Sequence, residues 1–300
     1  MTDIFERVEA IEGAAAREKE LLSLHTTFGV GGPCDFMVWA SDGGALREVV
    51  SLARAEGLPV FVLGRGSNLL VRDGGIEGVV VRLVDRLASI EVSGCQITAG
   101  AGASLGEVVS RATSAGIGGL EFLAGIPGTV GGAAVANAGA RDVWFGHRLV
   151  ELGVMASDLT ESVRKRDEVP FGYRSSGIAT DWIVTFAVLA GVPATVDQAR
   201  REVETYLERR RGTQPLGERS AGCIFRNPPG ESAGRLIEAA GLKGLSVGGA
   251  EVSTVHANFI VNSGGATARE ILDLVEIVRE RVRAVHGVDL ELEISVVGRE

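Results

Sequence analysis

One segment near the middle of the chain, residues 124–139, limits the folds open to this sequence more than any other feature. It reads AGIPGTVGGAAVANAG, so glycine and other small residues stand where a packed core would hold bulky side chains. Glycine tolerates positive φ angles and leaves backbone N–H groups open to close approach by a flat or anionic ligand. A second segment, LGRGSNLL at residues 63–70, has the same character. Together the two segments predict a ligand that carries an extended phosphate group.

The overall composition is that of an ordinary globular protein. The 300 residues are 45% hydrophobic and 23% charged, which suffices for one large domain or two to three modest ones. The net charge of −9 and the pI near 5.2 lack the basic footprint of a nucleic-acid binder. We therefore expect no nucleic-acid partner.

Cysteine and histidine spacing argues against a disulfide framework, an iron–sulfur cluster and a metal site. Cys34, Cys95 and Cys223 are far apart and lack C-x-x-C spacing, and their odd number suits a reducing compartment. The four histidines show no ligand spacing either. The first residues, MTDIFERVEAIEG, carry no secretory signal, so we expect a cytoplasmic protein without a bound metal.

The uncharged run at residues 122–140 could be mistaken for a membrane span. Its glycines, Pro127 and Asn137 would make a poor lipid-facing helix. We therefore interpret the run as buried loop and cofactor wall, and we expect no membrane attachment.

Periodicity along the first two thirds of the chain predicts a mixed α and β protein. Residues 44–56 carry apolar side chains at helical spacing and end at Gly57, and a short apolar run at 60–63 follows as a strand. A second helix is expected at residues 105–115. Further short apolar runs predict strands at residues 78–83, 90–92, 96–99, 150–155 and 183–189.

The last third contains two helices with recognisable starts. Residues 195–198, TVDQ, resemble a capping box for a helix that runs to Arg211. Residues 267–270, TARE, form a second box, and the helix that follows ends at Gly287, an expected C-cap. Its apolar stripe consists of Ile271, Val275, Val278, Val282 and Val285.

Two further features organise the C-terminal region. The TQPLG sequence at residues 213–217 reads as a linker, and a domain boundary is expected near residue 205. A last strand is expected at residues 290–297.

A glycine-rich turn at residues 100–106, GAGASLG, follows a strand-like run and opens a helix. This context suits a dinucleotide-binding fingerprint, but the third glycine arrives one position late and no βαβ unit follows. Glu121 lies at about the right distance in the wrong context. We favour a tight strand-to-helix turn, with a nicotinamide Rossmann site as the alternative.

Several motifs, taken in order, resemble one known family. Three are glycine-rich: TTFGVGGP at residues 26–33, LGRGSNLLVRDGG at 63–75, and GLEFLAGIPGTVGGAAVANAGA at 119–140. The motifs YRSS at 173–176, SAGCIFRNP at 220–228 and LEISVVG at 292–298 follow. From about residue 24 onward the chain is similar to the UDP-N-acetylenolpyruvoylglucosamine reductase (MurB) family, flavoenzymes of peptidoglycan precursor synthesis.

This resemblance implies an α+β fold with an FAD-binding domain of the p-cresol methylhydroxylase (PCMH) type at residues 27–193. That domain would consist of two α/β subdomains, at about 27–85 and 86–193. A C-terminal α+β substrate-binding domain would follow at 205–300, and residues 1–26 would form an N-terminal segment. The implied cofactor-binding residues are Gly64, Arg65, Gly66, Ser67, Asn68, Leu69, Gly125, Ile126, Pro127, Gly128, Thr129, Gly131, Gly132, Asn137 and Gly139.

The resemblance also implies three catalytic residues. In the family reaction NADPH reduces the flavin, hydride passes to C3 of an enolpyruvyl ether, and a proton reaches C2. Arg174 matches the arginine that stabilises the enolate charge, a task suited to a permanently charged, planar guanidinium. Cys223 stands where the family normally has a serine proton donor, and a thiol with an ordinary pKa of about 8.5 stays mostly protonated at neutral pH. Glu293 matches the C-terminal glutamate near the enolate or its proton donor.

Each catalytic candidate has a plainer alternative. Arg174 could be a surface loop arginine, Cys223 a small core residue, and Glu293 part of a solvated strand face. Alternation does not separate Glu293 from Glu291, since both fall on the same side of a strand, and only the motif register selects Glu293.

Substrate contacts are implied at Tyr173, Asn227 and Asn258, although the two asparagines could equally serve a turn or a strand. The arginine that the family often carries two residues after the glutamate is Ser295 here, so that contact is in doubt. No long insertion occurs between residues 190 and 209, as in the shorter variety of the family. The run 209–211 with Gln214 could face the substrate diphosphate or simply end a helix.

The expected function is therefore reduction of UDP-N-acetylglucosamine-enolpyruvate to UDP-N-acetylmuramate, with FAD as cofactor and NADPH as co-substrate. An FAD oxidase of the same fold is one alternative, which anaerobic reoxidation by the enolpyruvyl substrate would exclude. A non-catalytic nucleotide-sugar binder is another, and a colourless purified protein would favour it.

Overall fold

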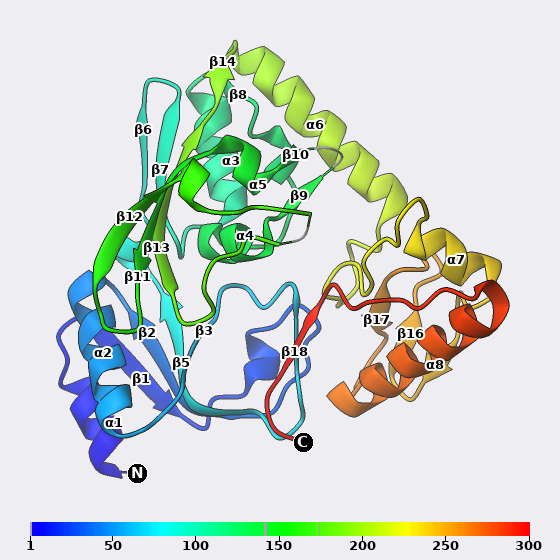
Figure 1. Ribbon diagram of the computed structural model, residues 1–300, viewed down its shortest axis with the longest axis horizontal. Helices are drawn as coiled ribbons and strands as arrows, with labels where there is room; N and C mark the ends of the chain where they lie inside the picture. Colours follow the sequence, from blue (N-terminus) through cyan, green and yellow to red (C-terminus); the bar gives the residue numbers. More distant parts are fainter. Residues whose placement is uncertain (1, 141–142, 174) are drawn as a thin grey trace. The chain divides into compact units, whose positions relative to one another are not determined.

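The computed structural model describes residues 2–140, 143–173 and 175–300 and contains both helices and sheets (Figure 1). The chain forms two compact units. The first unit comprises Met1–Glu18, Phe36–Arg65 and Gly78–Arg209, and the second comprises Lys19–Asp35, Gly66–Glu77 and Arg210–Glu300. No helix in the described part of the chain is long and apolar enough to cross a membrane.

A four-stranded sheet in the order β1-β2-β5-β3 includes both antiparallel and parallel pairs. Its strands are β1 (Ala14–Glu18), β2 (Cys34–Ala40), β5 (Ile76–Leu83) and β3 (Val60–Val62). Helix α2 (Gly43–Ala55) precedes β3, as the periodicity predicts, and the Asp42 carboxylate caps its start by accepting from the Ala45 N–H (3.0 Å). Helix α1 (Thr2–Glu9) leads into β1, so residues 14–18 are part of this sheet and not of a separate terminal segment.

A second sheet in the first unit has five antiparallel strands in the order β12-β11-β13-β7-β6. They are β12 (Glu161–Lys165), β11 (Leu149–Met155), β13 (Ile183–Ala190), β7 (Gln96–Gly100) and β6 (Ile90–Ser93). Helix α3 (Leu105–Ser114) lies beside it, and two small ladders complete the unit. The ladders pair β8 (Ile117–Gly118) with β14 (Val192–Pro193), and β9 (Gly139–Ala140) with β10 (Val143–Trp144).

One apolar core serves both sheets of the first unit. Val38, Val49 and Val81 around the four-stranded sheet belong to the same cluster of buried side chains as Leu152 and Ala187 of the five-stranded sheet. Burial of such side chains is the main favourable term in folding. The two subdomains expected from the family resemblance therefore share a core.

The turn at residues 100–106 is the tight strand-to-helix turn that we favour on sequence grounds. It joins β7 to α3, and the Ser104 hydroxyl caps the helix by accepting from the Glu107 N–H (3.2 Å). A Cβ atom at Gly100 would lie 2.2 Å from the Leu87 carbonyl oxygen, and one at Gly102 would lie 2.0 Å from that of Leu83. Backbone packing thus explains these glycines without a ligand.

The expectation that residues 122–140 are entirely loop is wrong. The segment contains a 3-10 turn, Glu121–Leu123, and helix α4, Val130–Ala136. The helix forms because Thr129 caps it, accepting from the Gly132 N–H at 3.3 Å, and because Val130 and Ala134 are fully buried. Asn137 ends the helix in the left-handed region, at φ +44°. Helix α5 (Phe145–Arg148) follows shortly after.

The second unit contains a three-stranded antiparallel sheet and a parallel strand pair. The sheet consists of β15 (Ser246–Val247), β16 (Ala250–Val252) and β17 (Ile260–Asn262), against which helix α8 (Ala268–His286) packs. Strand β18 (Ser295–Val297) pairs in parallel with β4 (Leu69–Val71), and helix α7 (Ala233–Ala239) contacts α8.

Both helix starts expected in the last third are confirmed. Helix α6 (Val196–Thr213) begins where the Thr195 N–H donates to Gln198 Oε1 (2.9 Å), and Thr267 and Glu270 form the box that opens α8. Gly287 ends α8 at φ +69°, as predicted. The apolar stripe is shorter than expected, because Val285 is 57% exposed while the four earlier members lie in the core.

The strand expected at residues 290–297 is also shorter in the structure. Only β18, Ser295–Val297, is a strand, and before it Leu292 forms an isolated bridge with Phe225. The expected strand is divided because its first part pairs with residues 224–226 and its last part with β4.

The second compact unit contains residues 19–35 and 66–77 as well as the C-terminal region. The consecutive domain ranges 27–193 and 205–300 remain a prediction.

Candidate active site

In the first unit, the segment after β3 lies directly against the loop before α4. A Cβ atom at Gly64 would stand 2.5 Å from Thr129 Oγ1, so only glycine fits there without displacing the side chain that caps α4. Gly125 adopts φ +72°, which also favours glycine. The two segments that sequence analysis assigns to the cofactor therefore meet on this unit at Gly64 and Thr129.

The backbone donors of this loop divide into two groups. The N–H groups of Val130 and Gly131 donate to the carbonyl oxygens of Ala103 (2.9 Å) and Ala101 (2.8 Å), so the first turn of α4 is satisfied by protein. Within the described residues, the N–H groups of Gly125, Gly128 and Thr129 have no acceptor. Clustered N–H groups of this kind suit an anionic ligand. The loop, more than the helix, provides the donors.

The second unit carries the other half of the glycine segment, residues 66–69. Gly66 has φ +59°, and a Cβ there would lie 2.6 Å from the His25 carbonyl oxygen. Its own carbonyl accepts from the Thr27 N–H (3.3 Å), and the Asn68 amide donates to the Glu293 carbonyl (3.2 Å). In the described part of the chain, the N–H groups of residues 66–68 have no acceptor. Here too, hydrogen bonds of the Gly66 carbonyl and the Asn68 side chain hold the segment, and its backbone N–H groups can donate to a ligand.

Two of the three predicted catalytic residues come from neighbouring extended segments of the second unit. Cys223 bridges Phe259, and the next residue, Ile224, donates to the Asn258 carbonyl (2.8 Å). On its other side, the Ile224 carbonyl accepts from the Glu293 N–H (2.8 Å). The structure therefore brings the Cys223 and Glu293 segments together, although they are far apart in sequence.

The environments of the two C-terminal glutamates differ, which the alternation of the sequence does not reveal. The Glu291 side chain is 79% exposed and lies 3.9 Å from an Arg226 guanidinium nitrogen. Glu293 is half-buried. Glu291 is thus the solvated residue, in agreement with the motif register that selects Glu293.

Cys223 also differs from the buried cysteine of the same unit. Cys34 is fully buried, and burial raises the pKa of its thiol to about 11. Cys223 is only half-buried. Of these two thiols, only Cys223 is partly exposed and lies on the segment whose next residue, Ile224, accepts from the Glu293 N–H.

Asn258 supports the Cys223 segment from its other side. It is 3% exposed, its carboxamide oxygen accepts from the Phe225 N–H (3.0 Å), and its amide donates to the Phe225 carbonyl (2.8 Å). Both polar atoms are therefore engaged with one backbone residue. This geometry gives Asn258 a structural role, and its contact with substrate remains a prediction.

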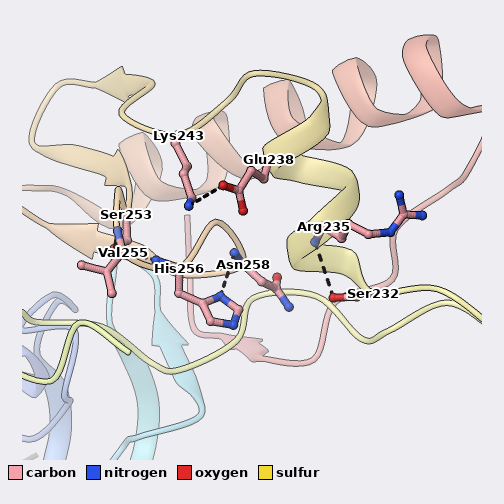
Figure 2. A network of polar contacts seen from close by, with 8 residues as sticks. All are labelled: Ser232, Arg235, Glu238, Lys243, Ser253, Val255, His256 and Asn258. Atoms are coloured by element: carbon pink, nitrogen blue, oxygen red, sulfur yellow. Dashed lines mark hydrogen bonds and ion pairs between the residues drawn. The ribbon is translucent and has the colours of Figure 1, made fainter. Parts of the chain in front are cut away.

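His256 lies next to Asn258 and is not identified by sequence analysis (Figure 2). Its Nδ1 atom accepts a hydrogen bond from the Asn258 N–H (3.2 Å), so this nitrogen carries no proton. Burial lowers the pKa of the imidazole, in keeping with a neutral ring. The ring contacts Phe259, with centroids 4.9 Å apart, and approaches Gly234 of α7. The spacing H-x-N at residues 256–258 is the only sequence signal of this contact.

The remaining substrate candidates are placed as follows. Asn227 is exposed, and its side-chain oxygen accepts from the Ala233 N–H (3.0 Å) at the start of α7. Gln214 accepts from the Arg210 guanidinium (3.2 Å) at the end of α6. Ser295 lies on β18 and donates its N–H to the Asn68 carbonyl (3.0 Å).

Tyr173 lies at the tip of a tight turn in the first unit, while Arg174 falls outside the described residues. The turn borders a hollow of about 130 Å³, between Asn137, Trp144, His147, Arg166, Phe171 and Tyr173. The Trp144 and Tyr173 rings meet edge to face, with centroids 6.3 Å apart. Among the described residues, no group of three or more histidines, cysteines or carboxylates could hold a metal.

Comparison with known proteins gives the family. The model for the UDP-N-acetylenolpyruvoylglucosamine reductase C-terminal domain matches residues 214–297, and the model for an FAD-binding domain matches residues 34–158. The UDP-N-acetylenolpyruvoylglucosamine reductase of Moorella thermoacetica is 46% identical over 93% of this chain and 92% of its own length. The chain belongs to the UDP-N-acetylenolpyruvoylglucosamine reductase (MurB) family.

Two further matches, each covering more than nine tenths of the chain, belong to the same family. The Bacillus licheniformis reductase is 39% identical over the full length of both proteins. The crystal structure of MurB from Thermus caldophilus superposes with a TM-score of 0.82 and 39% identity, covering 94% of this chain and 98% of that one. The expected α+β fold, with an FAD-binding domain and a C-terminal MurB domain, is therefore confirmed. MurB proteins are FAD-dependent oxidoreductases, and this chain is one of them.

Proposed function

We propose that this chain reduces UDP-N-acetylglucosamine-enolpyruvate to UDP-N-acetylmuramate, with NADPH as electron donor, in the cytoplasm. Membership of the MurB family supports this assignment. The observation that carries it for this chain is the adjacency of the Cys223 and Glu293 segments on the second unit. The pairing of these two segments supports the proposal, because delivery of a proton to an enolate requires the proton donor and its assisting group in one site.

The residues present fit an FAD diphosphate. Backbone N–H donors without a protein acceptor occur in the described parts of both glycine segments, at residues 66–68 and at Gly125, Gly128 and Thr129. Gly64 and Gly66 pack closely against protein atoms, since a Cβ atom would lie 2.5 Å from Thr129 Oγ1 and 2.6 Å from the His25 carbonyl oxygen respectively. When bound, FAD supplies the redox chemistry that links NADPH to the enolpyruvyl group. The chain contributes binding, orientation and proton transfer.

In the proposed mechanism, three residues act on the enolpyruvyl group. Cys223 donates the proton to C2, Glu293 assists that transfer, and Arg174 stabilises the negative charge that develops on the carboxylate. Asn258 holds the Cys223 segment through both backbone groups of Phe225. Tyr173 and Asn227 contact the nucleotide sugar. Neither nucleic acid nor a membrane takes part.

The test is anaerobic stopped-flow spectroscopy of the flavin, first with NADPH and then with the enolpyruvyl substrate. We expect NADPH to bleach the flavin and the substrate to restore it. Cys223→Ala should slow reoxidation by about 10²- to 10⁴-fold, roughly 3 to 5 kcal/mol of barrier, because no group then delivers the proton. Cys223→Ser should retain substantial turnover, and flavin reduction should be nearly unchanged in both variants.

Three results would contradict parts of this proposal. A flavin that only oxygen reoxidises would indicate an oxidase of the same fold. A purified protein unable to retain flavin would indicate a nucleotide-sugar binder. Full-rate reoxidation in Cys223→Ala would remove Cys223 from the mechanism and leave the overall reaction standing.

A further inference from the structure

The turn that carries Tyr173 is closed by two backbone hydrogen bonds. The Gly172 N–H donates to the Ser175 carbonyl (2.8 Å), and the Ser175 N–H donates to the Gly172 carbonyl (3.2 Å). Only two residues lie between these points. Any displacement of Gly172 therefore moves the tip of the turn with it.

Asn137 connects this turn to the cofactor segment within the first unit. Its amide nitrogen donates to the Gly172 carbonyl at 2.7 Å, and its carboxamide oxygen accepts from the Gly146 N–H at 2.9 Å. The side chain is 3% exposed. Asn137 is also the residue at which α4 ends, immediately after the glycine-rich loop.

Few side chains could replace Asn137 in this position. The backbone has φ +44°, which glycine and asparagine tolerate best. The two hydrogen bonds also demand a donor and an acceptor on one short side chain, which asparagine provides. The side chain faces backbone on both sides, so it is engaged with protein groups and not turned toward a ligand.

We propose that Asn137 is a positioning residue, which fixes Gly172 relative to the FAD-binding loop and so sets the place of the neighbouring Tyr173. The inference rests on the proposed function for its catalytic consequence. It gives the Asn137 side chain a role that the family resemblance does not imply, while a contact of this residue with the cofactor remains a prediction. A displacement of a reacting group by about 1 Å can lower a rate by about 10²-fold, so loss of the Asn137–Gly172 hydrogen bond should slow flavin reoxidation measurably.

Asn137→Asp tests this role because an ionised aspartate loses the hydrogen bond to the Gly172 carbonyl and keeps the one from the Gly146 N–H. An ionised carboxylate can still accept from the Gly146 N–H, but it faces the Gly172 carbonyl with no proton to donate. A protonated carboxyl donates to Gly172 and restores the link. We therefore expect reoxidation about 10- to 100-fold slower than wild type at pH 8, with the ratio to wild type recovering as the pH falls.

Charged neighbours are common to both proteins. His147, Arg166 and Tyr173 border the same hollow in wild type and variant alike. The ratio of the reoxidation rate of Asn137→Asp to that of wild type at each pH therefore reports the effect of the introduced carboxyl alone. A merely structural role for Asn137 would give a pH-independent ratio.

Asn137→Gly is the second variant, since glycine keeps the left-handed backbone and removes both hydrogen bonds. We expect it to retain FAD and to slow reoxidation at every pH. Hydrogen–deuterium exchange of the peptide around residues 170–176 should speed up in this variant without any substrate present. That measurement tests the anchor even if the enolpyruvyl compound proves not to be the substrate.

Asn262→Asp is a matched control in the second unit. Asn262 also donates to a backbone carbonyl, that of Phe28 (3.0 Å), and accepts from backbone N–H groups, those of Gly264 and Ala266 (both 3.1 Å). We expect this variant to lose stability while its reoxidation rate stays near that of wild type.

Wild-type reoxidation and unchanged exchange in both Asn137 variants would overturn the proposal. Loss of FAD with normal reoxidation in the fraction that keeps it would also overturn it, and would assign Asn137 to cofactor binding. Failure of Asn137→Gly to fold would show a general structural role, which is equally contrary to the proposal.

Discussion

His256 shows how a single buried contact can make stability depend on pH. Its Nδ1 atom accepts from the Asn258 N–H (Figure 2). The Asn258 side chain in turn bonds both backbone groups of Phe225, in the segment that carries Cys223. Burial lowers the pKa of the ring below its ordinary value of 6.5. Protonation of the folded protein at this site would require loss of the hydrogen bond.

The sign of the pH effect follows from these two states. Below about pH 6.5 the unfolded chain binds a proton at His256 that the folded chain resists, so the free energy of unfolding falls as the pH drops toward the folded-state pKa. His256→Asn retains an acceptor for the Asn258 N–H and removes the titration. We expect its free energy of unfolding, measured in urea at pH 7.5 and about pH 5, to fall less than that of wild type. An identical pH dependence in the two proteins would contradict this.

At the residue scale, the sequence predicts part of the site. Motif register selects Glu293 over Glu291, and the structure agrees in exposing Glu291 to solvent and half-burying Glu293. The backbone partners of the Asn137 and Asn258 side chains could not be predicted from the sequence. Those partners, Gly172 and Phe225, lie 35 and 33 residues away in the chain.

At the scale of elements, α8 shows how several groups combine to start one helix. Thr267 and Glu270 form the capping box, and the Asp73 carboxylate accepts from the Ala268 N–H (2.9 Å) and the Arg269 N–H (3.0 Å). The backbone N–H groups of Thr267 and Gly249 lower the pKa of Glu270. Three side chains, those of Thr267, Glu270 and Asp73, thus satisfy four backbone N–H donors at this helix start.

Asp73→Ala should therefore destabilise the second unit by about 1 kcal/mol, because two helix N–H groups lose their acceptor and a negative charge leaves the helix N-terminus. Asp273→Ala is the control on the same helix. It removes only an exposed ion pair with Arg269 (2.9 Å), worth less than about 0.5 kcal/mol. Urea denaturation of both variants measures the difference, and equal losses would show that Asp73 does not act as a cap.

Helices were easier to predict than strands for a physical reason. The capping boxes of α6 and α8 join side chains and backbone groups three residues apart, so the local sequence reveals them, although it does not reveal the contribution of Asp73 to α8. The end of the chain depends on which distant segment it meets, and residues 290–297 change partner partway along. Helix α4 was missed because burial of Val130 and Ala134 outweighs the poor helix propensity of its glycines.

At the scale of the whole molecule, each compact unit is built from three separate stretches of the chain. Residues 19–35 and 66–77 belong with the C-terminal region, not with their neighbours in sequence. Composition and periodicity describe only local preference, so they cannot show that a short early segment pairs with a late one.

Cofactor loading offers a test at this scale, because a ligand that binds only the folded chain stabilises it. Gly64→Ala places a Cβ atom 2.5 Å from Thr129 Oγ1 and should weaken FAD binding by about tenfold or more, about 1.4 kcal/mol. Gly106→Ala is the control, since a Cβ there meets nothing within 4 Å in an exposed helical position. Melting curves against FAD concentration should shift less for Gly64→Ala and be unchanged for Gly106→Ala. Equal FAD dependence in both would show that Gly64 has no part in the cofactor site.

The parallel pairing of β18 with β4 has a consequence for biosynthesis. Residues 69–71 leave the ribosome well before their partner strand, residues 295–297. About 200 residues must be translated in between, which at about 5–20 residues per second takes on the order of tens of seconds. During that interval the nascent β4 has an open edge on the side that β18 will occupy, so chaperones that shield such edges should associate with translating chains until β18 has emerged.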